Sequence, residues 1–273
     1  QAIGAHVVEF LKGEVAAGRL PETLGPIQSG VGQVTNAVLR ELGSGGFRDL
    51  SMYTETLQDS ALELLEQGVF RLASTCAMSL TEPAQARFYE KIDFFRERII
   101  LRSQEISNHP EVVRRLGLVS LNTPIEVDIY GNVNSTHIMG TCMMNGIGGS
   151  GDFARNARVN LFATASTAKG GDISCIVPMV SHVDHTEHDT QIIVTEQGVA
   201  DLRWKTPRER ADLLIDRCAH PDYRPQLREY VRQAEAAAKG LHTPHDLRRA
   251  LSWHQQYLDQ GTMKQAIQEE ESL

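Results

Sequence analysis

Short runs of aliphatic and β-branched residues alternate with longer amphipathic stretches along most of this sequence. Each run is bounded by Gly, Pro, Asp or Asn, which is typical of strands, and the stretches between them favour helices. Strands that alternate with helices build a layered fold in which helices cover a parallel sheet. We therefore expect an α/β fold with a largely parallel central sheet flanked by helices. The predicted strands are Thr23–Ile27, Val69–Ala73, Val119–Asn122, Val127–Tyr130, Ile173–Val177 and Gln191–Thr195.

Proline marks the start of two of the predicted helices. Pro110 and Pro207 fit first-turn positions, where the missing N–H leaves no helical hydrogen bond unmade. The predicted helices are Gly32–Leu42, Ser60–Glu66, Phe88–Phe94, Pro110–Leu116, Gly151–Asn156, Pro207–Arg217 and Gln226–Ala238.

The character of the sequence changes after Tyr223, where Ala, Glu and Arg become frequent. This composition predicts helices that pack on the outside of the domain or on a partner. The chain contains no internal repeat and no low-complexity linker. We expect one domain over residues 1–273, with an α/β core (1–225) and a helical C-terminal tail (226–273).

The composition is that of a globular protein with an acidic balance. Hydrophobic residues make up 41%, charged residues 23%, and the formal net charge is −8, which argues against a nucleic-acid surface. No apolar run approaches the roughly 18 residues of a membrane span, and the first residues do not have the pattern of a signal peptide. They read as the inside of a helix, so we expect a fragment or a missing N-terminal part. Four widely spaced cysteines suit free thiols in the cytoplasm: Cys76, Cys142, Cys175 and Cys218.

Four short segments contain residues that could carry chemistry. They are Tyr53–Asp59 around Glu55, Ser107–Pro110 around Asn108, the glycine-rich turn Asn145–Phe153, and Val194–Gly198 around Glu196. Taken alone, Glu55 would be a solvated carboxylate and Asn108 a helix cap ahead of Pro110. Residues 146–151 also satisfy G-x-G-x-x-G, but no short parallel strand leads into them, which argues against a dinucleotide site.

A run of histidines and acids at residues 181–189 raises the question of a metal site. Its three histidines and three carboxylates could in principle hold zinc or iron. The run matches no ligand spacing with a known mechanism, so we expect no metal.

In their order along the chain, these segments resemble the C-terminal half of the acetyl-CoA hydrolase and succinyl-CoA:acetate CoA-transferase family, which are class I CoA-transferases. The resemblance extends from about Gly25 to about Tyr223. It implies that Glu55 is a covalent nucleophile, and that the Asn108 amide and the Gly149 N–H form an oxyanion hole. It also implies that Glu196 shapes the carboxylate pocket as a hydrogen-bonding acid.

The resemblance further implies a binding site for coenzyme A, which acts as a substrate and not as a resident cofactor. The loop at residues 26–32 would lie beside the thiol end of CoA, with Val31 against the acyl group. In the family, an N-terminal half absent from this chain completes the site, and members form homodimers. The implied CoA-binding residues are Ile27, Gln28, Ser29, Gly30, Val31, Ile125, Gly149 and Lys169.

The implied activity is transfer of CoA between small carboxylic acids, such as acetate and succinate, through a glutamyl-CoA thioester on Glu55. An acetyl-CoA hydrolase, in which water resolves the same intermediate, is the alternative. A non-catalytic module that binds CoA or a partner stays open as a third reading.

Overall fold

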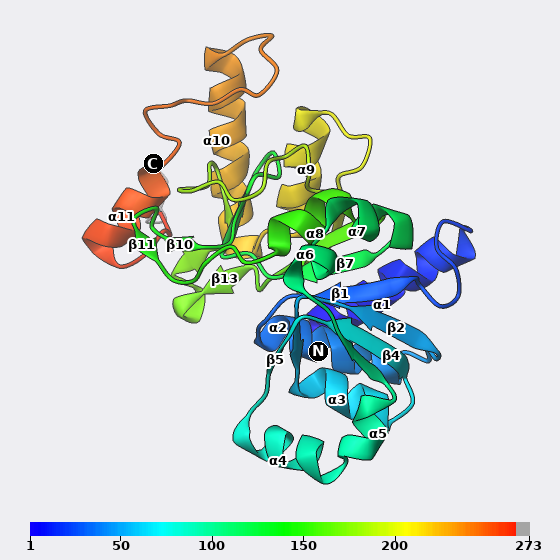
Figure 1. The fold of residues 1–273 in the computed structure, drawn as a ribbon. Coiled ribbons are helices and arrows are strands. Elements are labelled where there is room, and N and C mark those ends of the chain that lie inside the picture. Colours follow the sequence, from blue (N-terminus) through cyan, green and yellow to red (C-terminus); the bar gives the residue numbers. More distant parts are fainter. Residues whose placement is uncertain (266–273) are drawn as a thin grey trace.

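A computed structural model describes residues 1–265, and its centre is an eight-stranded sheet (Figure 1). The strand order is β17-β16-β12-β7-β1-β2-β4-β6. All neighbouring strands are parallel except β16 and β17, which are antiparallel. The expected α/β class with a largely parallel sheet is confirmed. The strands are β1 (Pro26–Ser29), β2 (Leu50–Tyr53), β4 (Phe70–Thr75), β6 (Ile99–Leu101), β7 (Val119–Asn122), β12 (Val159–Ala163), β16 (Ile192–Thr195) and β17 (Gly198–Asp201).

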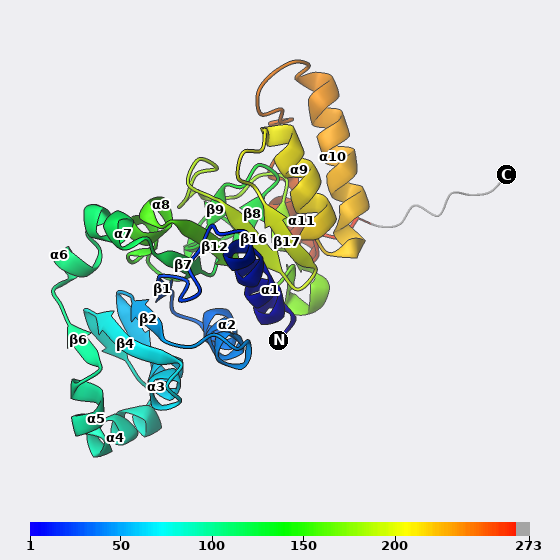
Figure 2. The same ribbon diagram turned by 90° about the vertical axis from the view of Figure 1, so that its right-hand side faces the viewer.

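Helices cover both faces of this sheet (Figure 2). α1 packs against α2, β16 and β17, while α8 packs on β7 and β12. α9 packs on β17, and α10 lies beside α9. The helices are α1 (Ala2–Ala16), α2 (Gln33–Ser44), α3 (Asp59–Glu66), α4 (Glu82–Glu90), α5 (Ile92–Arg96), α6 (Gln104–Ser107), α7 (Pro110–Leu116), α8 (Ser150–Asn156), α9 (Pro207–Arg217), α10 (Arg224–Ala237) and α11 (Ser252–Gln260), with 3-10 turns η1 (Lys169–Gly171) and η2 (Pro221–Tyr223). None of the helices in residues 1–265 is long and apolar enough to cross a membrane.

The two larger hydrophobic cores among residues 1–265 lie on opposite faces of the sheet. Successive side chains of a strand point to opposite faces, and β16 follows this rule: Ile192 and Val194 belong to the first core, whereas Ile193 belongs to the second. The first core includes α1, α2 and α3. The second includes α9 and a small sheet of three strands, β8 (Glu126–Asp128), β9 (Val133–Asn134) and β15 (Ile176–Val177).

Three further two-stranded sheets accompany the central sheet. They are β3 (Thr56–Gln58) with β5 (Ala77–Ser79), β10 (His137–Ile138) with β11 (Cys142–Met143), and β13 (Thr167–Ala168) with β14 (Ile173–Ser174).

The C-terminal tail contributes to the second core. Leu227, Tyr230 and Ala234 of α10, Trp253 of α11 and Met263 are all buried there. Residues 266–273 of the predicted tail lie outside the described residues.

The strand prediction was incomplete and partly misplaced. Four strands of the central sheet, β2, β6, β12 and β17, were not predicted, and Ile173–Val177 forms two short strands, β14 and β15. The predicted strand Thr23–Ile27 instead forms as Pro26–Ser29, because Leu24 and Gly25 have positive φ angles of 61° and 80°. Such backbone angles belong to a turn and cannot continue a strand.

One predicted helix was also misplaced. Phe88–Phe94 spans the junction between α4 and α5, where Lys91 leaves the helical conformation with φ −109° and ψ 31°.

The parallel strands bring distant parts of the sequence to one edge of the sheet. Gly30 follows β1, Glu55 follows β2, Cys76 follows β4, and Glu196 follows β16. In open α/β sheets, ligands bind beside the carboxyl ends of the strands. The site is therefore expected at this edge.

Candidate active site

Glu55 occupies the sharp turn between β2 and β3, with its backbone fixed by the neighbouring strand. Its carbonyl oxygen accepts hydrogen bonds from Cys76 N (3.1 Å), Ala77 N (3.0 Å) and Thr75 Oγ1 (2.8 Å). The preceding residue, Thr54, is buried and donates its hydroxyl to Ser29 O at 2.9 Å. These contacts hold the main chain and leave the half-buried carboxylate of Glu55 free to face the site.

Gly149, which is 94 residues away in the sequence, contacts this carboxylate. Its N–H donates a hydrogen bond of 2.7 Å to Glu55 Oε2. Gly149 is buried and directly precedes α8, so its amide lies at the start of a helix. The backbone N–H at the start of α8 is thus aimed at the carboxylate of Glu55.

The side chain of Asn108 also lies beside Gly149. Its Nδ2 is so close to Gly149 that a Cβ added there would overlap it, and Asn108 Oδ1 is buried without a hydrogen-bond partner in residues 1–265. The capping role considered for Asn108 belongs to His109 instead, whose Nδ1 accepts from Glu111 N at 3.3 Å. The Asn108 amide is therefore not used as the cap of α7. Its neighbour α6 is fixed by Tyr53 Oη, which donates to Ile106 O at 2.8 Å.

The Gly149→Ala variant is expected to lose about 10²- to 10³-fold in kcat of the reaction proposed below. Its methyl group would lie 2.5 Å from Glu55 Oε2 and overlap Asn108 Nδ2. Because Gly149 has φ −84°, alanine meets no backbone strain and the fold should persist. Steady-state kinetics with circular dichroism would measure both effects.

Gly151→Ala is the matched control, since a Cβ at Gly151 meets nothing within 4 Å. This variant should keep its activity. An equal loss in both variants would contradict a specific role for the space beside Gly149.

Glu196 follows β16 and is held by three hydrogen bonds. Ser166 N donates to Oε2 at 2.8 Å, Gln197 Nε2 donates to Oε1 at 3.0 Å, and the Ser166 hydroxyl also donates to Oε1. Burial raises the pKa of Glu196, but the hydrogen bonds outweigh burial and the net pKa is lowered. Glu196 is thus ionised at neutral pH and accepts hydrogen bonds, where the resemblance implied a hydrogen-bonding acid.

The loop at residues 26–32 divides into a buried and an exposed part. Ile27 is only 1% exposed and belongs to the first core, and the buried Gln28 side chain bonds to Ser120 and Asn122. Ile27 and Gln28 therefore do not present their side chains to a ligand.

The exposed part of this loop begins after the strand. Ser29 is buried and donates its hydroxyl to Gly30 O at 3.1 Å. The backbone at Gly30 approaches Asn122 so closely that a Cβ there would lie 2.7 Å from Oδ1. Val31 is 63% exposed. Among residues 27–31, its side chain is therefore the one that is open to a bound molecule.

Ile125 and Lys169 come from two other segments of the chain. Ile125 is half-buried and donates its N–H to Asn134 O at 2.8 Å. Lys169 is exposed at the start of η1, with φ 52°. Within residues 1–265, no hydrogen bond joins either of them to Glu55.

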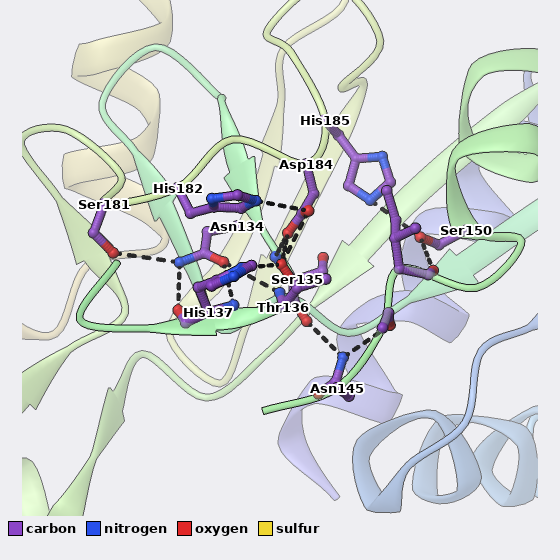
Figure 3. A network of polar contacts seen from close by, with 12 residues as sticks. Asn134, Ser135, Thr136, His137, Asn145, Ser150, Ser181, His182, Asp184 and His185 are labelled. Carbon is purple, nitrogen blue, oxygen red and sulfur yellow. Dashed lines mark hydrogen bonds and ion pairs between the residues drawn. The ribbon is translucent and has the colours of Figure 1, made fainter. Parts of the chain in front are cut away.

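The histidine-acid run is bound to the protein by its own polar contacts (Figure 3). Asp184 accepts from Ser135 N at 2.7 Å and from Thr136 Oγ1, and His182 Nε2 lies 3.4 Å from Asp184 Oδ1. His185 is buried and its Nε2 lies 3.2 Å from Ser150 Oγ. In residues 1–265, no three His, Cys, Asp or Glu side chains are arranged to hold a metal ion.

Three residues of the site were missed by the sequence analysis. Ser166 holds Glu196, and Thr75 and Cys76 hold the backbone of Glu55. Burial, followed by the nearby Glu55 carboxylate, raises the pKa of the Cys76 thiol, so this thiol stays protonated at neutral pH. The available signal was their position after β12 and β4, but β12 itself was not predicted.

Residues 85–231 match the family described as acetyl-CoA hydrolase/transferase C-terminal domain. This chain belongs to that family. The match covers Asn108, Gly149 and Glu196, and it confirms the resemblance drawn from the four segments.

Similar proteins extend the match over nearly the whole chain. A succinyl-CoA:acetate CoA-transferase of Clostridium kluyveri is 57% identical over 264 residues, which are 97% of this chain and 49% of that protein. An acetyl-CoA hydrolase of Candida albicans is 48% identical over 271 residues, which are 97% of this chain and 52% of that protein. The chain thus spans about half the length of these relatives.

The fold has solved counterparts as well. The crystal structure of 4-hydroxybutyrate CoA-transferase from Porphyromonas gingivalis is 26% identical, with a TM-score of 0.63 over 82% of this chain and 55% of that chain.

Proposed function

We propose that this chain forms half of an enzyme that moves CoA between small carboxylic acids through a glutamyl-CoA thioester on Glu55. The observation that carries the proposal is the 2.7 Å hydrogen bond from Gly149 N to Glu55 Oε2, with Asn108 Nδ2 against the same glycine. A carboxylate faced by two N–H donors suits both a nucleophile and the oxyanion that forms next to it.

The reaction begins with the carboxylate. An oxygen of Glu55 attacks the acyl-CoA carbonyl, the C–S bond breaks, and a mixed anhydride and CoA thiolate result. The thiolate then attacks the glutamyl carbonyl and releases the acyl group as a free carboxylate. An acceptor carboxylate reverses these steps and leaves as a new acyl-CoA. If water attacks the glutamyl thioester instead, Glu55 and CoA are regenerated and the net reaction is hydrolysis.

The donors would act in each tetrahedral step. Preorganised N–H groups that face a developing oxyanion can contribute several kcal/mol, and Gly149 N and Asn108 Nδ2 would be these donors. We assign Glu196 to the carboxylate pocket, because it accepts hydrogen bonds at the same sheet edge. The exposed Val31 would contact the acyl end of CoA.

The remaining assignments concern the substrates and partners. CoA enters as acyl-CoA and is a substrate, and no resident metal or cofactor is required by the steps above. The backbone of residues 27–30, together with Ile125 and Lys169, would contact CoA. A preceding half, such as that in the relatives, would complete the site, and the whole protein would form a homodimer.

Trapping of the intermediate tests this proposal. The longest native chain containing these residues is incubated with acetyl-CoA or succinyl-CoA and then with borohydride, which reduces a glutamyl thioester to an alcohol. A mass loss of about 14 Da that maps to Glu55 is expected in the wild type and not in Glu55→Ala.

Two further results separate the alternatives. One result would favour a hydrolase over a transferase. The glutamyl thioester would form without an acceptor carboxylate, and untrapped enzyme would release CoA from it in water at the rate of turnover. A full-length protein that binds CoA but shows no change at Glu55 would overturn covalent transfer, and a CoA-binding module would then be the better description.

A further inference from the structure

The turn that carries Gly149 has little support of its own. Residues 145–148 are exposed, and the turn contains Gly146, Gly148 and Gly149. Glycine-rich backbone has many accessible conformations, and fixing each residue costs about 1–2 kcal/mol in entropy. A donor that must stay aimed at an oxyanion therefore needs a brace from elsewhere in the fold.

His185 contacts the C-terminal end of this turn (Figure 3). Its Nε2 lies 3.2 Å from Ser150 Oγ, and Ser150 Oγ donates to Ile147 O at 2.9 Å. A serine hydroxyl has one proton, so when Ser150 donates to Ile147, His185 must donate its Nε2–H to Ser150. These two bonds close the turn directly around Gly149.

His185 is itself rigidly placed. Its N–H and carbonyl pair with Val133 of β9 at 3.1 and 2.8 Å, and its ring lies 4.9 Å from the Phe162 ring of β12. The side chain is 2% exposed, and burial lowers the pKa of the imidazole, although Asp184 and Asp189 oppose this effect. The ring is thus a neutral donor anchored to two strands.

Asp184, the preceding residue, holds the other end of the turn. Its carboxylate accepts from Ser135 N at 2.7 Å and from Thr136 Oγ1 at 2.8 Å. Ser135 O in turn accepts from Asn145 Nδ2 at 2.9 Å, and Thr136 O accepts from Met144 N at 2.8 Å. Adjacent residues of one loop therefore fasten both ends of the glycine turn (Figure 3).

We propose that Asp184 and His185 are positioning residues that keep the Gly149 amide aimed at the oxyanion. This inference rests on the proposed function, because the oxyanion belongs to that reaction. It gives the histidine-acid run a role that needs no metal. Neither residue touches the substrate, and both act through the turn.

The test compares His185→Phe, Ser150→Ala and their double variant in the longest native chain. Phenylalanine keeps a buried ring beside Phe162 but has no N–H. We expect kcat to fall about tenfold in each single variant, less than when a whole oxyanion donor is removed, with KM for acetyl-CoA within about twofold. Because both changes break one contact, the double variant should resemble the single variants. His185→Gln, which keeps an N–H, should recover most of the activity.

His188→Phe is the matched control in the same run, since the His188 side chain is 81% exposed. It should leave kcat unchanged. Unchanged kcat in His185→Phe and Ser150→Ala, additive losses, or a failure of glutamine to improve on phenylalanine would overturn the proposal. If His185→Phe does not fold, Ser150→Ala decides alone, because it removes one half-buried hydroxyl.

Hydrogen–deuterium exchange separates this proposal from the proposed function. Residues 145–151 should exchange faster in Ser150→Ala and His185→Phe than in the wild type. This difference is expected whether or not the wild type forms a glutamyl adduct. Absence of the adduct would overturn the proposed function, whereas unchanged exchange in these residues would overturn the brace.

Discussion

The Glu55→Gln variant is expected to lose about 10⁴-fold or more in kcat, because a neutral amide cannot replace the carboxylate as a nucleophile. Glutamine has the same shape, so its side-chain oxygen can still accept from Gly149 N, which lies 2.7 Å from Oε2 in the native protein. The loss would therefore report on the chemistry and not on the packing. Steady-state kinetics with acetyl-CoA and an acceptor carboxylate measure it.

Glu55→Asp is the informative companion. It keeps the carboxylate but withdraws it by one methylene, and misplacement by about 1 Å can cost about 10²-fold in rate. The thermal midpoint of both variants should stay near that of the wild type, because the backbone of Glu55 is held by Thr75, Cys76 and Ala77 independently of the side chain. A Gln variant that retains more than about one hundredth of kcat would exclude Glu55 as the nucleophile.

Local chemistry made some elements predictable from the sequence. Helices α7 and α9 form with the expected bounds, and each has proline at its start. Thr206 and Glu209 add a capping box to α9, in which each side chain bonds the backbone of the other. Such signals lie within a few residues of one another, so no knowledge of the tertiary structure is needed to find them.

Strand β12 shows what the sequence pattern conceals. Its residues are all buried, yet Asn160 interrupts the apolar run. Asn160 Nδ2 donates to Asp189 O at 2.9 Å, a partner far along the chain, whereas Asn160 Oδ1 has no hydrogen-bond partner in residues 1–265. A buried polar group is tolerated where it is hydrogen-bonded, and that partner becomes visible only in the folded chain.

The site was predicted from motifs, but its geometry was not. Glu55 and Gly149 are 94 residues apart, and only the sheet order brings them together. Motif matching also does not show which side chains are buried, and it therefore grouped Ile27 and Gln28 with the exposed Val31. Both belong to a central strand buried on its two faces, and neither side chain reaches the edge where Val31 lies.

The residues before the glycine-rich turn form the antiparallel hairpin of β10 and β11, and no parallel strand leads into the turn. The close approach of Asn108 and Glu55 to Gly149 accounts for glycine at that position.

A second large effect is expected in stability, at the point where α1 joins the sheet. The buried carboxylate of Glu14 accepts two hydrogen bonds of 2.9 Å from Arg203 and three from Arg19, the shortest of which is 2.7 Å. Arg203 also bonds Asp201 of β17, so this cluster ties the end of α1 to the sheet edge. The Arg203 hydrogen bond lowers the pKa of Glu14 from 4.5 to about 2 against the opposing effect of burial.

Glu14→Ala is therefore expected to lower the free energy of unfolding at pH 7 by about 3 kcal/mol, the equivalent of this pKa shift. Loss of one partner from a buried pair has a similar magnitude, although Arg203 would keep Asp201 as a counter-charge. Urea denaturation of the wild type and the variant measures the difference.

The pH dependence fixes the sign of this effect. A carboxyl group whose pKa is lowered by folding stabilises the protein above its unfolded pKa, and that contribution fades as the group is protonated. The difference between the wild type and Glu14→Ala should therefore be full above pH 4.5 and shrink as the pH falls toward about 2. Glu9→Ala, an exposed position on the same helix, should change little at any pH. A difference between the wild type and Glu14→Ala that stays constant from neutral to acid pH would show that packing, and not the charge of Glu14, holds α1 in place.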